Sequence, residues 1–213
     1  MEPQTGLRER KKQQTRQLIF EAASRLFAAR GFDAVTVAEV ARAADVSEMT
    51  VFNYFPTKED LCFAGMEFYE ERLLDAVRGR AEGVSALEAF CRLVVNDCGR
   101  LAAEERTKVI TKAAALIGGS PALQVREREI VNRYTQRLAE LLAAETGARP
   151  DDVEPQGVAS ALMGTHRALV AYVRRSVLAG RRGPKLAADA RSQARRAFAR
   201  LDRGLAEYAI RSH

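Results

Sequence analysis

The sequence has few of the residues that disulfide frameworks and metal centres require. It contains only three cysteines, Cys62, Cys91 and Cys98, and their spacing matches no common metal-ligand pattern. Their odd number is typical of a protein in a reducing compartment, because disulfide frameworks pair their cysteines. Cys91 and Cys98 are seven residues apart and therefore share one face of a helix. We interpret them as small core residues, with a redox-sensing pair as the alternative.

Long apolar runs and catalytic clusters are also missing. No run of 18 apolar residues occurs, so no membrane span is expected. The stretch MEPQTGLRERKKQQTR has basic residues but no apolar segment after them, so we expect no secretory signal and a cytoplasmic location. The two histidines are His166 and His213, and no Gly-rich phosphate loop follows a strand. The sequence thus predicts no enzyme, metal site or cofactor; an all-helical enzyme with an unrecognised site is the alternative.

Patterns typical of β-strands are rare. Alanine, leucine, arginine and glutamate dominate, and no period-two alternation is long enough for a sheet. Glycine and proline mark breaks at residues 118–121, 147–150 and 180–184. The sequence therefore predicts an all-α fold of about nine helices. The expected ranges are 10–30, 37–44, 48–54, 57–80, 85–103, 105–117, 121–146, 154–179 and 185–210.

Residues 35–61, VTVAEVARAADVSEMTVFNYFPTKEDL, contain two short helical patterns separated by a polar break. Thr36 and Glu39 have the spacing of a capping box, which predicts a helix from Val37. Ser47 is a good N-cap for a second helix. Two short helices joined by a tight turn indicate a helix-turn-helix.

The second of these helices has two distinct faces. Val51 and Phe55 are four residues apart and point inward together. The opposite face carries polar and aromatic residues. A helix has the right width to enter the DNA major groove, where such side chains can meet base edges. These outward residues are Met49, Thr50, Asn53 and Tyr54. We predict that Asn53 and Thr50 contact bases, while Tyr54 and Lys58 contact the DNA backbone.

Residues from about 15 to 61 resemble the N-terminal domain of TetR (tetracycline repressor) family transcriptional regulators. The matching segments are LFAARGFDAVTV, AEVARAADVS and TVFNYFPTKEDL, which cover about a quarter of the chain. The resemblance implies a three-helix DNA-binding domain with a basic arm at residues 1–56 and a helical regulatory and dimerisation domain at 57–213. It further implies a repressor that binds a palindromic operator in double-stranded DNA as a homodimer and is released by an unknown small-molecule effector.

The resemblance also implies which residues would contact DNA. In relatives, the second helix of the motif enters the major groove, and positions matching Lys58 and Thr36–Val37 meet phosphates. Glu48 departs from the basic or neutral residue frequent at its position, but it could accept a hydrogen bond from cytosine. Phe52 replaces the usual tyrosine and cannot donate to a phosphate, a role that Tyr54 could take. The DNA-binding candidates are Thr36, Val37, Ser47, Glu48, Met49, Thr50, Phe52, Asn53, Tyr54 and Lys58.

Charge is unevenly distributed. Residues 1–60 hold nine basic and nine acidic residues, but RERKKQQTR at 8–16 holds five basic residues and one acidic residue. A basic arm before the first helix could lie along the phosphate backbone or enter the minor groove, and a solvated tail is the alternative for residues 1–7. Residues 165–213 hold twelve basic and three acidic residues. We interpret these as solvated helix faces, with a second surface for nucleic acid or an acidic partner as the alternative.

In relatives, the helices after the DNA-binding domain surround a ligand cavity. His166 is a candidate because it lies mid-helix among apolar residues, where it either orients a ligand or is simply hydrogen-bonded within the bundle. The other candidates are apolar residues on successive helices. The full set is Phe68, Phe90, Ile110, Ile117, Tyr134, Leu138, Met163 and His166. A DNA-binding module that responds to no ligand is the alternative function.

The last two helices would form the dimer interface by the same resemblance. The final helix has apolar residues at intervals of three and four, which gives it one apolar face. This face could equally pack only within its own chain. The interface candidates are Leu162, Leu169, Tyr172, Ala194, Leu201 and Leu205.

Overall fold

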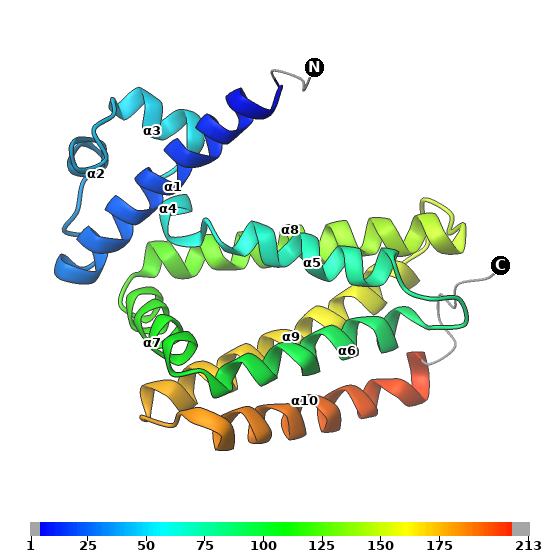
Figure 1. Ribbon diagram of the computed structural model, residues 1–213. Coiled ribbons are helices and arrows are strands. Elements are labelled where there is room, and N and C mark those ends of the chain that lie inside the picture. The colour runs from blue at the N-terminus through cyan, green and yellow to red at the C-terminus, as the bar shows by residue number, and fades with distance from the viewer. Residues whose placement is uncertain (1–4, 206–213) are drawn as a thin grey trace. The chain divides into compact units, whose positions relative to one another are not determined.

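The structure is a computed structural model that describes residues 5–205 (Figure 1). These residues form ten α-helices, one 3₁₀ helix and no strand, which confirms the predicted all-α fold. No helix in this range is both long and apolar enough to cross a membrane. The elements are α1 (Thr5–Arg30), α2 (Val37–Ala43), α3 (Glu48–Tyr54), α4 (Asp60–Phe63), α5 (Met66–Arg78), α6 (Ala86–Cys98), η1 (Gly99–Ala102), α7 (Glu104–Gly118), α8 (Pro121–Thr146), α9 (Glu154–Leu178) and α10 (Gly183–Leu205).

The chain divides into two compact units. The N-terminal unit comprises Met1–Met66 and Ala115–Glu127, and the C-terminal unit comprises Glu67–Ala114 and Arg128–His213. Because the boundaries fall inside α7 and α8, both helices belong partly to each unit. The expected boundary after residue 56 separates a DNA-binding domain from a regulatory and dimerisation domain by function. It stays a prediction.

The N-terminal unit is built on α1, which packs against α2 and α4, while α2 packs against α3. Its core contains large side chains that are almost fully buried, and the Phe27 and Phe32 rings lie 5.3 Å apart between centroids. Val51 and Phe55 are only 1% and 2% exposed, so the predicted inward face of α3 is confirmed. Burying such side chains contributes about 1.5–3 kcal/mol each. The inward face thereby fixes which residues of α3 face solvent.

In the C-terminal unit, α10 packs against α6, η1 and α9, and Figure 1 shows it running alongside α6 and α9. Its buried face is Leu186, Ala190, Ala194 and Phe198. The small alanines let α10 approach its neighbours closely, and Phe198 meets the Phe90 ring edge-on at 5.9 Å. This apolar face therefore packs within its own chain.

A buried cation connects three segments of the C-terminal unit. Arg80 lies just after α5 and is 6% exposed. Its guanidinium donates to the carbonyl oxygens of Val77 at 2.5 Å and Val84 at 3.0 Å, and to Glu145 Oε2 at 2.6 Å on α8. Since a buried charge is costly unless it is paired and hydrogen-bonded, these contacts make its burial possible.

Two of the predicted helices need correction. The single helix expected at 57–80 is wrong, because the chain turns at Ala64 and Gly65 between α4 and α5. Glycine is unfavourable inside a helix, which explains a break there. The helix expected at 85–103 ends at Cys98 and continues as η1. The break at Ala64 and Gly65 raises the number of α-helices from the expected nine to ten within residues 5–205.

The basic segment at 8–16 is also not an arm before the first helix. Helix α1 begins at Thr5, so these residues are helical. Lysine, arginine, glutamine and glutamate are good helix formers, and no proline interrupts them. Gln13 donates to Glu9 Oε1 at 3.1 Å, one turn earlier. The cations of this segment are therefore presented by a helix.

Candidate nucleic-acid interface and interior polar cluster

The turn between α2 and α3 closes with a well-defined hydrogen-bond pattern. The Val46 N–H donates to the Ala41 carbonyl at 3.0 Å, and the Asp45 N–H donates to the Arg42 carbonyl at 3.3 Å. These are the two bonds of a Schellman motif, which requires a left-handed residue between them. Asp45 takes that conformation with φ of 55°. The tight turn fixes the direction in which the chain enters α3.

The start of α2 is held by the predicted capping box. The Glu39 N–H donates to Thr36 Oγ1 at 3.2 Å, and the Thr36 N–H donates to Glu39 Oε2 at 2.8 Å. Arg30 adds a bond to Glu39 Oε1 at 2.8 Å and donates to the Ala34 carbonyl. The Arg30 hydrogen bond, and then those from Thr36, lower the pKa of Glu39 to about 2. Thr36 therefore caps α2, as the sequence predicts, and α1 is tied to that cap.

Ser47 caps α3 in the predicted way. Its Oγ accepts a hydrogen bond from the Thr50 N–H at 3.0 Å. The Ser47 and Thr50 hydroxyls also share a hydrogen bond of 2.8 Å. Thr50 is half-buried, so its hydroxyl is already engaged within the motif. The expectation that Thr50 contacts bases stays a prediction.

The outward face of α3 presents an unusual mixture of side chains to solvent. Met49 is 69% exposed and Phe52 is 44% exposed, while Glu48 and Asn53 are also exposed. Tyr54 is half-buried. Large apolar side chains at such exposure are not used by the core of their own unit. Together they give α3 an amide, a carboxylate and two apolar groups that can face a partner.

Lys58 lies against the same unit. It is half-buried, and its Nζ is 4.1 Å from the centroid of the Phe32 ring, which is a cation–π contact. Val37 is half-buried at the first position of α2, and Thr36 is exposed. The DNA-binding candidates thus all belong to the N-terminal unit, clustered at α3 and at the helix starts on either side of it.

The sequence interpretation missed the residues that join the corner between α7 and α8 to the DNA-binding motif within the N-terminal unit. Asp60 accepts from the Thr57 N–H at 3.0 Å and from Arg126 Nη2 at 2.7 Å. Ser120, which is 1% exposed, donates to Asp33 Oδ1 at 3.1 Å. These partners are 66 and 87 residues apart in the sequence, so helical periodicity could not pair them.

A polar cluster lies inside the C-terminal unit. Tyr69 Oη of α5 and His166 Nε2 of α9 share a hydrogen bond of 3.1 Å, and their rings stack with centroids 5.6 Å apart. Phe90 of α6 meets the His166 ring edge-on at 6.2 Å. Burial lowers the pKa of His166 to about 4, a shift that the negative charge of Asp97 partly opposes. The imidazole is therefore neutral at pH 7.

Asp97 of α6 provides the charge of this cluster. Its Oδ1 accepts from Arg72 Nη2 at 2.9 Å, and Arg100 Nη1 lies 3.7 Å away. Its Oδ2 is buried and has no hydrogen-bond partner within residues 5–205. Burial first, and the Asp97 charge second, raise the pKa of Tyr69. Tyr69 thus keeps its proton at neutral pH.

The structure brings together only some of the predicted ligand residues. Phe90 and His166 touch, while Tyr134, Leu138 and Met163 are buried in the C-terminal unit and Ile110 is half-buried there. Ile117 belongs to the N-terminal unit. The Phe68 side chain lies outside the described residues. The cluster residues that were missed are Tyr69, Arg72 and Asp97.

The dimer candidates are corrected in part. Leu162 and Ala194 are 0% and 1% exposed, because their own chain already buries them, so they cannot present their side chains to a partner. Leu169, Tyr172 and Leu201 are half-buried. The Tyr172 hydroxyl accepts from Arg181 Nη1 at 3.0 Å. The Leu205 side chain lies outside the described residues.

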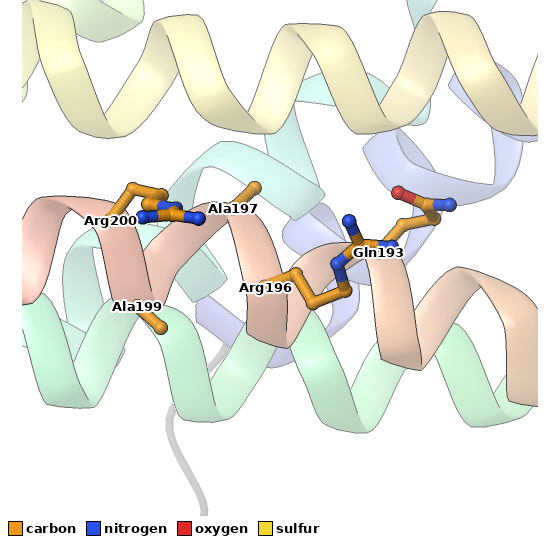
Figure 2. Close-up of a pocket in the computed structure, with 5 residues that line it drawn as sticks. All are labelled: Gln193, Arg196, Ala197, Ala199 and Arg200. Atoms are coloured by element: carbon orange, nitrogen blue, oxygen red, sulfur yellow. The ribbon is translucent and has the colours of Figure 1, made fainter.

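The exposed surface of α10 contains a pocket of about 480 Å³ (Figure 2). Gln193, Arg196, Ala197, Ala199 and Arg200 line it, and all five are exposed. Figure 2 shows the five side chains along one stretch of α10. The pocket therefore combines two arginines, which carry apolar stems and charged ends, with two small alanines.

The cysteines carry no sign of reactivity. Burial raises the pKa of Cys98 to about 11 and that of Cys62 to about 12, and it also raises the pKa of Cys91. Since the thiolate is the reactive form, these environments disfavour the redox-sensing alternative. Among the described residues, no three His, Cys, Asp or Glu side chains are grouped as metal ligands would be.

Comparison with known proteins identifies the family. Residues 19–64 match the model described as bacterial regulatory proteins, tetR family, and residues 84–206 match the MftR C-terminal domain. The chain is 30% identical over 166 residues to the putative mycofactocin biosynthesis transcriptional regulator MftR of Mycobacterium tuberculosis, spanning 76% of this chain and 80% of that protein. It is 29% identical over 151 residues to the HTH-type transcriptional regulator TcmR of Streptomyces glaucescens, spanning 69% and 67%.

A solved structure shows the same fold. NalD, the secondary repressor of the MexAB-OprM multidrug efflux pump in Pseudomonas aeruginosa, aligns with a TM-score of 0.56 at 21% identity, over 89% of this chain and 96% of that chain. The two family models cover the helix-turn-helix and most of the C-terminal unit. The chain therefore belongs to the TetR family of transcriptional regulators, and α2 and α3 are its helix-turn-helix DNA-binding element.

Proposed function

We propose that the protein is a repressor that binds a palindromic operator as a homodimer in the cytoplasm and releases it when a small molecule binds the C-terminal unit. Regulators of this family bind DNA, function as dimers and bind small-molecule ligands. The observation that carries the proposal is the outward face of α3, where exposed polar and apolar side chains have no role in their own core. The repressor role is supported by the similarity in fold to NalD, which is itself a repressor.

On the DNA side, Asn53 is the strongest candidate for a base contact. Its amide is exposed on α3 and can pair with adenine through two hydrogen bonds. Met49 and Phe52 are the exposed apolar groups that can contact thymine methyls, and Glu48 can accept from cytosine. Thr50 acts mainly on its own helix, because its hydroxyl is bonded to Ser47. Lys58 and Tyr54 would contact phosphates beside the groove.

A dimer is needed because a palindromic operator presents two half-sites about one helical turn apart. On α9, Gly157, Gly164 and Ala168 are exposed, and a Cβ added at either glycine would meet no atom of the chain within 4 Å. Small exposed residues allow another helix to approach closely. Tyr172 on α9 and Leu201 on α10 are half-buried. We assign the faces of α9 and α10 that carry these residues to the partner.

The DNA-binding part of the proposal is tested by selecting operators from random double-stranded DNA with purified protein. We expect a palindrome with two half-sites about 10 base pairs apart. Selected sequences without twofold symmetry would contradict a symmetric dimer on DNA. A failure to enrich any sequence at low salt would contradict DNA recognition by α3.

The dimer is tested by sedimentation of wild-type protein and of Leu201→Asp. A carboxylate placed in an apolar contact without a partner is costly, so Leu201→Asp should sediment as a monomer. Val109→Asp is the matched control, because Val109 is 57% exposed on α7, which is not one of the helices that we assign to the partner. A monomeric wild type, or a Leu201→Asp protein that remains dimeric, would reject the interface.

A further inference from the structure

The half-buried carboxylate of Asp97 has one oxygen that its own chain leaves without a partner. Oδ1 is bonded to Arg72, whereas Oδ2 is buried and accepts no hydrogen bond from residues 5–205. Nearly all buried polar atoms in native proteins are paired, so an orphaned carboxylate oxygen needs an explanation. A group that arrives from outside the chain can supply the missing donor.

The surroundings of Asp97 are mainly aromatic. Tyr69, Phe90 and His166 come from α5, α6 and α9, and their rings contact one another around His166. Figure 1 shows these three helices in the C-terminal unit. Arg72 connects the carboxylate to these rings, because its guanidinium donates to Asp97 Oδ1 at 2.9 Å and its Cζ lies 5.7 Å from the centroid of the Tyr69 ring. Planar ring faces of this kind favour a ring-bearing molecule.

The charges around Asp97 limit which kind of donor can approach Oδ2. The guanidinium of Arg72 already neutralises the Asp97 carboxylate, and Arg100 lies 3.7 Å from it. A cationic group approaching Oδ2 would be repelled by these two guanidinium groups, and an anionic group would be repelled by the carboxylate itself. Tyr69 and His166 are both neutral at pH 7 and add no full charge. A neutral donor such as a hydroxyl meets neither repulsion and forms a charge-assisted hydrogen bond.

We propose that the C-terminal unit binds a neutral ring-bearing molecule whose hydroxyl donates to Asp97 Oδ2 while its ring packs against Tyr69, Phe90 and His166. This assignment rests on the proposed function, because it names the chemical class of the effector for the same unit. Arg72 is a positioning residue in this arrangement, since it holds the carboxylate through Oδ1 and leaves Oδ2 for the ligand.

The test is calorimetric titration of full-length protein with four matched probes: 4-phenylphenol, biphenyl, 4-phenylbenzoic acid and 4-phenylbenzylamine. A hydrogen bond to a charged group corresponds to a gain of roughly 10- to 100-fold in affinity. We expect 4-phenylphenol to bind at least tenfold more tightly than biphenyl, and both charged probes to bind more weakly than 4-phenylphenol. Equal binding of 4-phenylphenol and biphenyl, binding led by a charged probe, or no binding of any probe would overturn the assignment.

Variants locate the donor contact. The double variant Arg72→Met/Asp97→Leu replaces both partners with apolar groups, so it leaves no unpaired charge that could unfold the protein. It should bind 4-phenylphenol no more tightly than biphenyl while its helical circular dichroism is retained. Asp75→Asn, an exposed carboxylate on α5, is the matched control and should keep the wild-type preference. A double variant that keeps the preference would overturn the assignment to Asp97.

Operator binding separates this inference from the proposed function. Probe binding that depends on Asp97, together with no operator selected from random DNA, would leave the ligand assignment standing while the repressor proposal fails. A protein that binds a selected operator but does not bind 4-phenylphenol would leave DNA recognition standing while the ligand assignment fails. If both hold, 4-phenylphenol should weaken operator binding by wild type and leave operator binding by the double variant unchanged.

Discussion

The helix starts of α2 and α3 and the interior of the C-terminal unit are held by polar bonds of very different sequence range. In the motif, the caps at Thr36 and Ser47 join residues three apart. In the C-terminal unit, the bonds from Tyr69 to His166 and from Arg80 to Glu145 join residues 97 and 65 apart. Local bonds are visible as spacing in a sequence, whereas distant bonds depend on how whole helices pack. A DNA-reading surface can therefore be recognised from sequence, while a ligand site must be found in the structure.

The largest expected effect is at the long-range ion pair of the C-terminal unit. Arg80→Met should lower the free energy of unfolding of this unit by about 3 kcal/mol, because the carbonyls of Val77 and Val84 and the carboxylate of Glu145 all lose their donor. The measurement is urea unfolding followed by circular dichroism, with hydrogen exchange to separate the units. Arg78→Met is the matched control: the pair with Asp75 is exposed, so the cost should stay below about 1 kcal/mol. Equal losses for both variants would contradict the structural role of Arg80.

The two units should also differ in the pH range over which acid weakens them. The pKa of His166 is lowered from its ordinary 6.5 to about 4 in the folded protein. As pH falls, the unfolded chain protonates His166 before the folded protein does, so stability is lost between pH 6.5 and about pH 4. The pKa of Glu39 falls from 4.5 to about 2, so its contribution is present above pH 4.5 and is lost as pH falls toward 2.

Hydrogen exchange of each unit across this pH series is the measurement. His166→Gln should flatten the change between pH 6.5 and 4 in the C-terminal unit, and Glu39→Gln should flatten the change below pH 4.5 in the N-terminal unit. Each variant serves as the control for the other. If both units lose stability over the same pH range, other groups control the acid response. The same conclusion follows if the stability losses remain after these substitutions.

Removing a local cap should have a smaller effect. Thr36→Ala and Ser47→Ala should each cost about 1 kcal/mol of stability, because each leaves a helix N–H group without its acceptor. Thermal melting and exchange of α2 and α3 amides would measure this. Ser24→Ala, at an exposed position inside α1, is the control and should change stability by only a few tenths of a kcal/mol. Unchanged melting with a collapse of DNA affinity would make the two residues DNA contacts rather than caps.

The smallest effect is expected at the turn between α2 and α3. Asp45→Gly should stabilise the N-terminal unit by about 0.5 kcal/mol, because glycine adopts the left-handed conformation without steric cost. Asp45→Ala should instead destabilise it, since alanine suits this conformation less well than either residue. Chemical unfolding of the two variants decides the matter. Identical stabilities for glycine and alanine at this position would contradict the left-handed geometry.

Much of the N-terminal unit could be predicted from sequence because its signals are local. The capping box at Thr36, the N-cap at Ser47 and the inward pair Val51 and Phe55 follow from spacings of three and four residues, and the structure confirms each. The helix predicted from residue 10 starts earlier, at Thr5, and this start could have been predicted too, since residues 8–16 have high helix propensity. Spacing did not show that the hydroxyls of Ser47 and Thr50 are hydrogen-bonded to each other.

Predictions for the C-terminal unit were less complete for a physical reason. Periodicity identifies buried positions but not which buried residues meet. His166 was predicted as a candidate from its polarity among apolar neighbours, whereas Asp97 and Arg72 look like ordinary helix-surface charges in the sequence. Likewise, the apolar face of α10 was visible, but only the packing of α6 and α9 shows that its own chain covers Ala194.

The outward face of α3 is the surface that we expect to read base sequence. The direct measurement is the affinity of wild type, Asn53→Ala and Lys58→Ala for the selected operator and its single-base variants across a salt series. Asn53→Ala should cost about 1–3 kcal/mol on the operator and relax the preference at one base position of each half-site. Lys58→Ala should weaken binding to all sequences alike and reduce the salt slope by about one. Equal losses on every sequence for both variants would contradict base reading by α3.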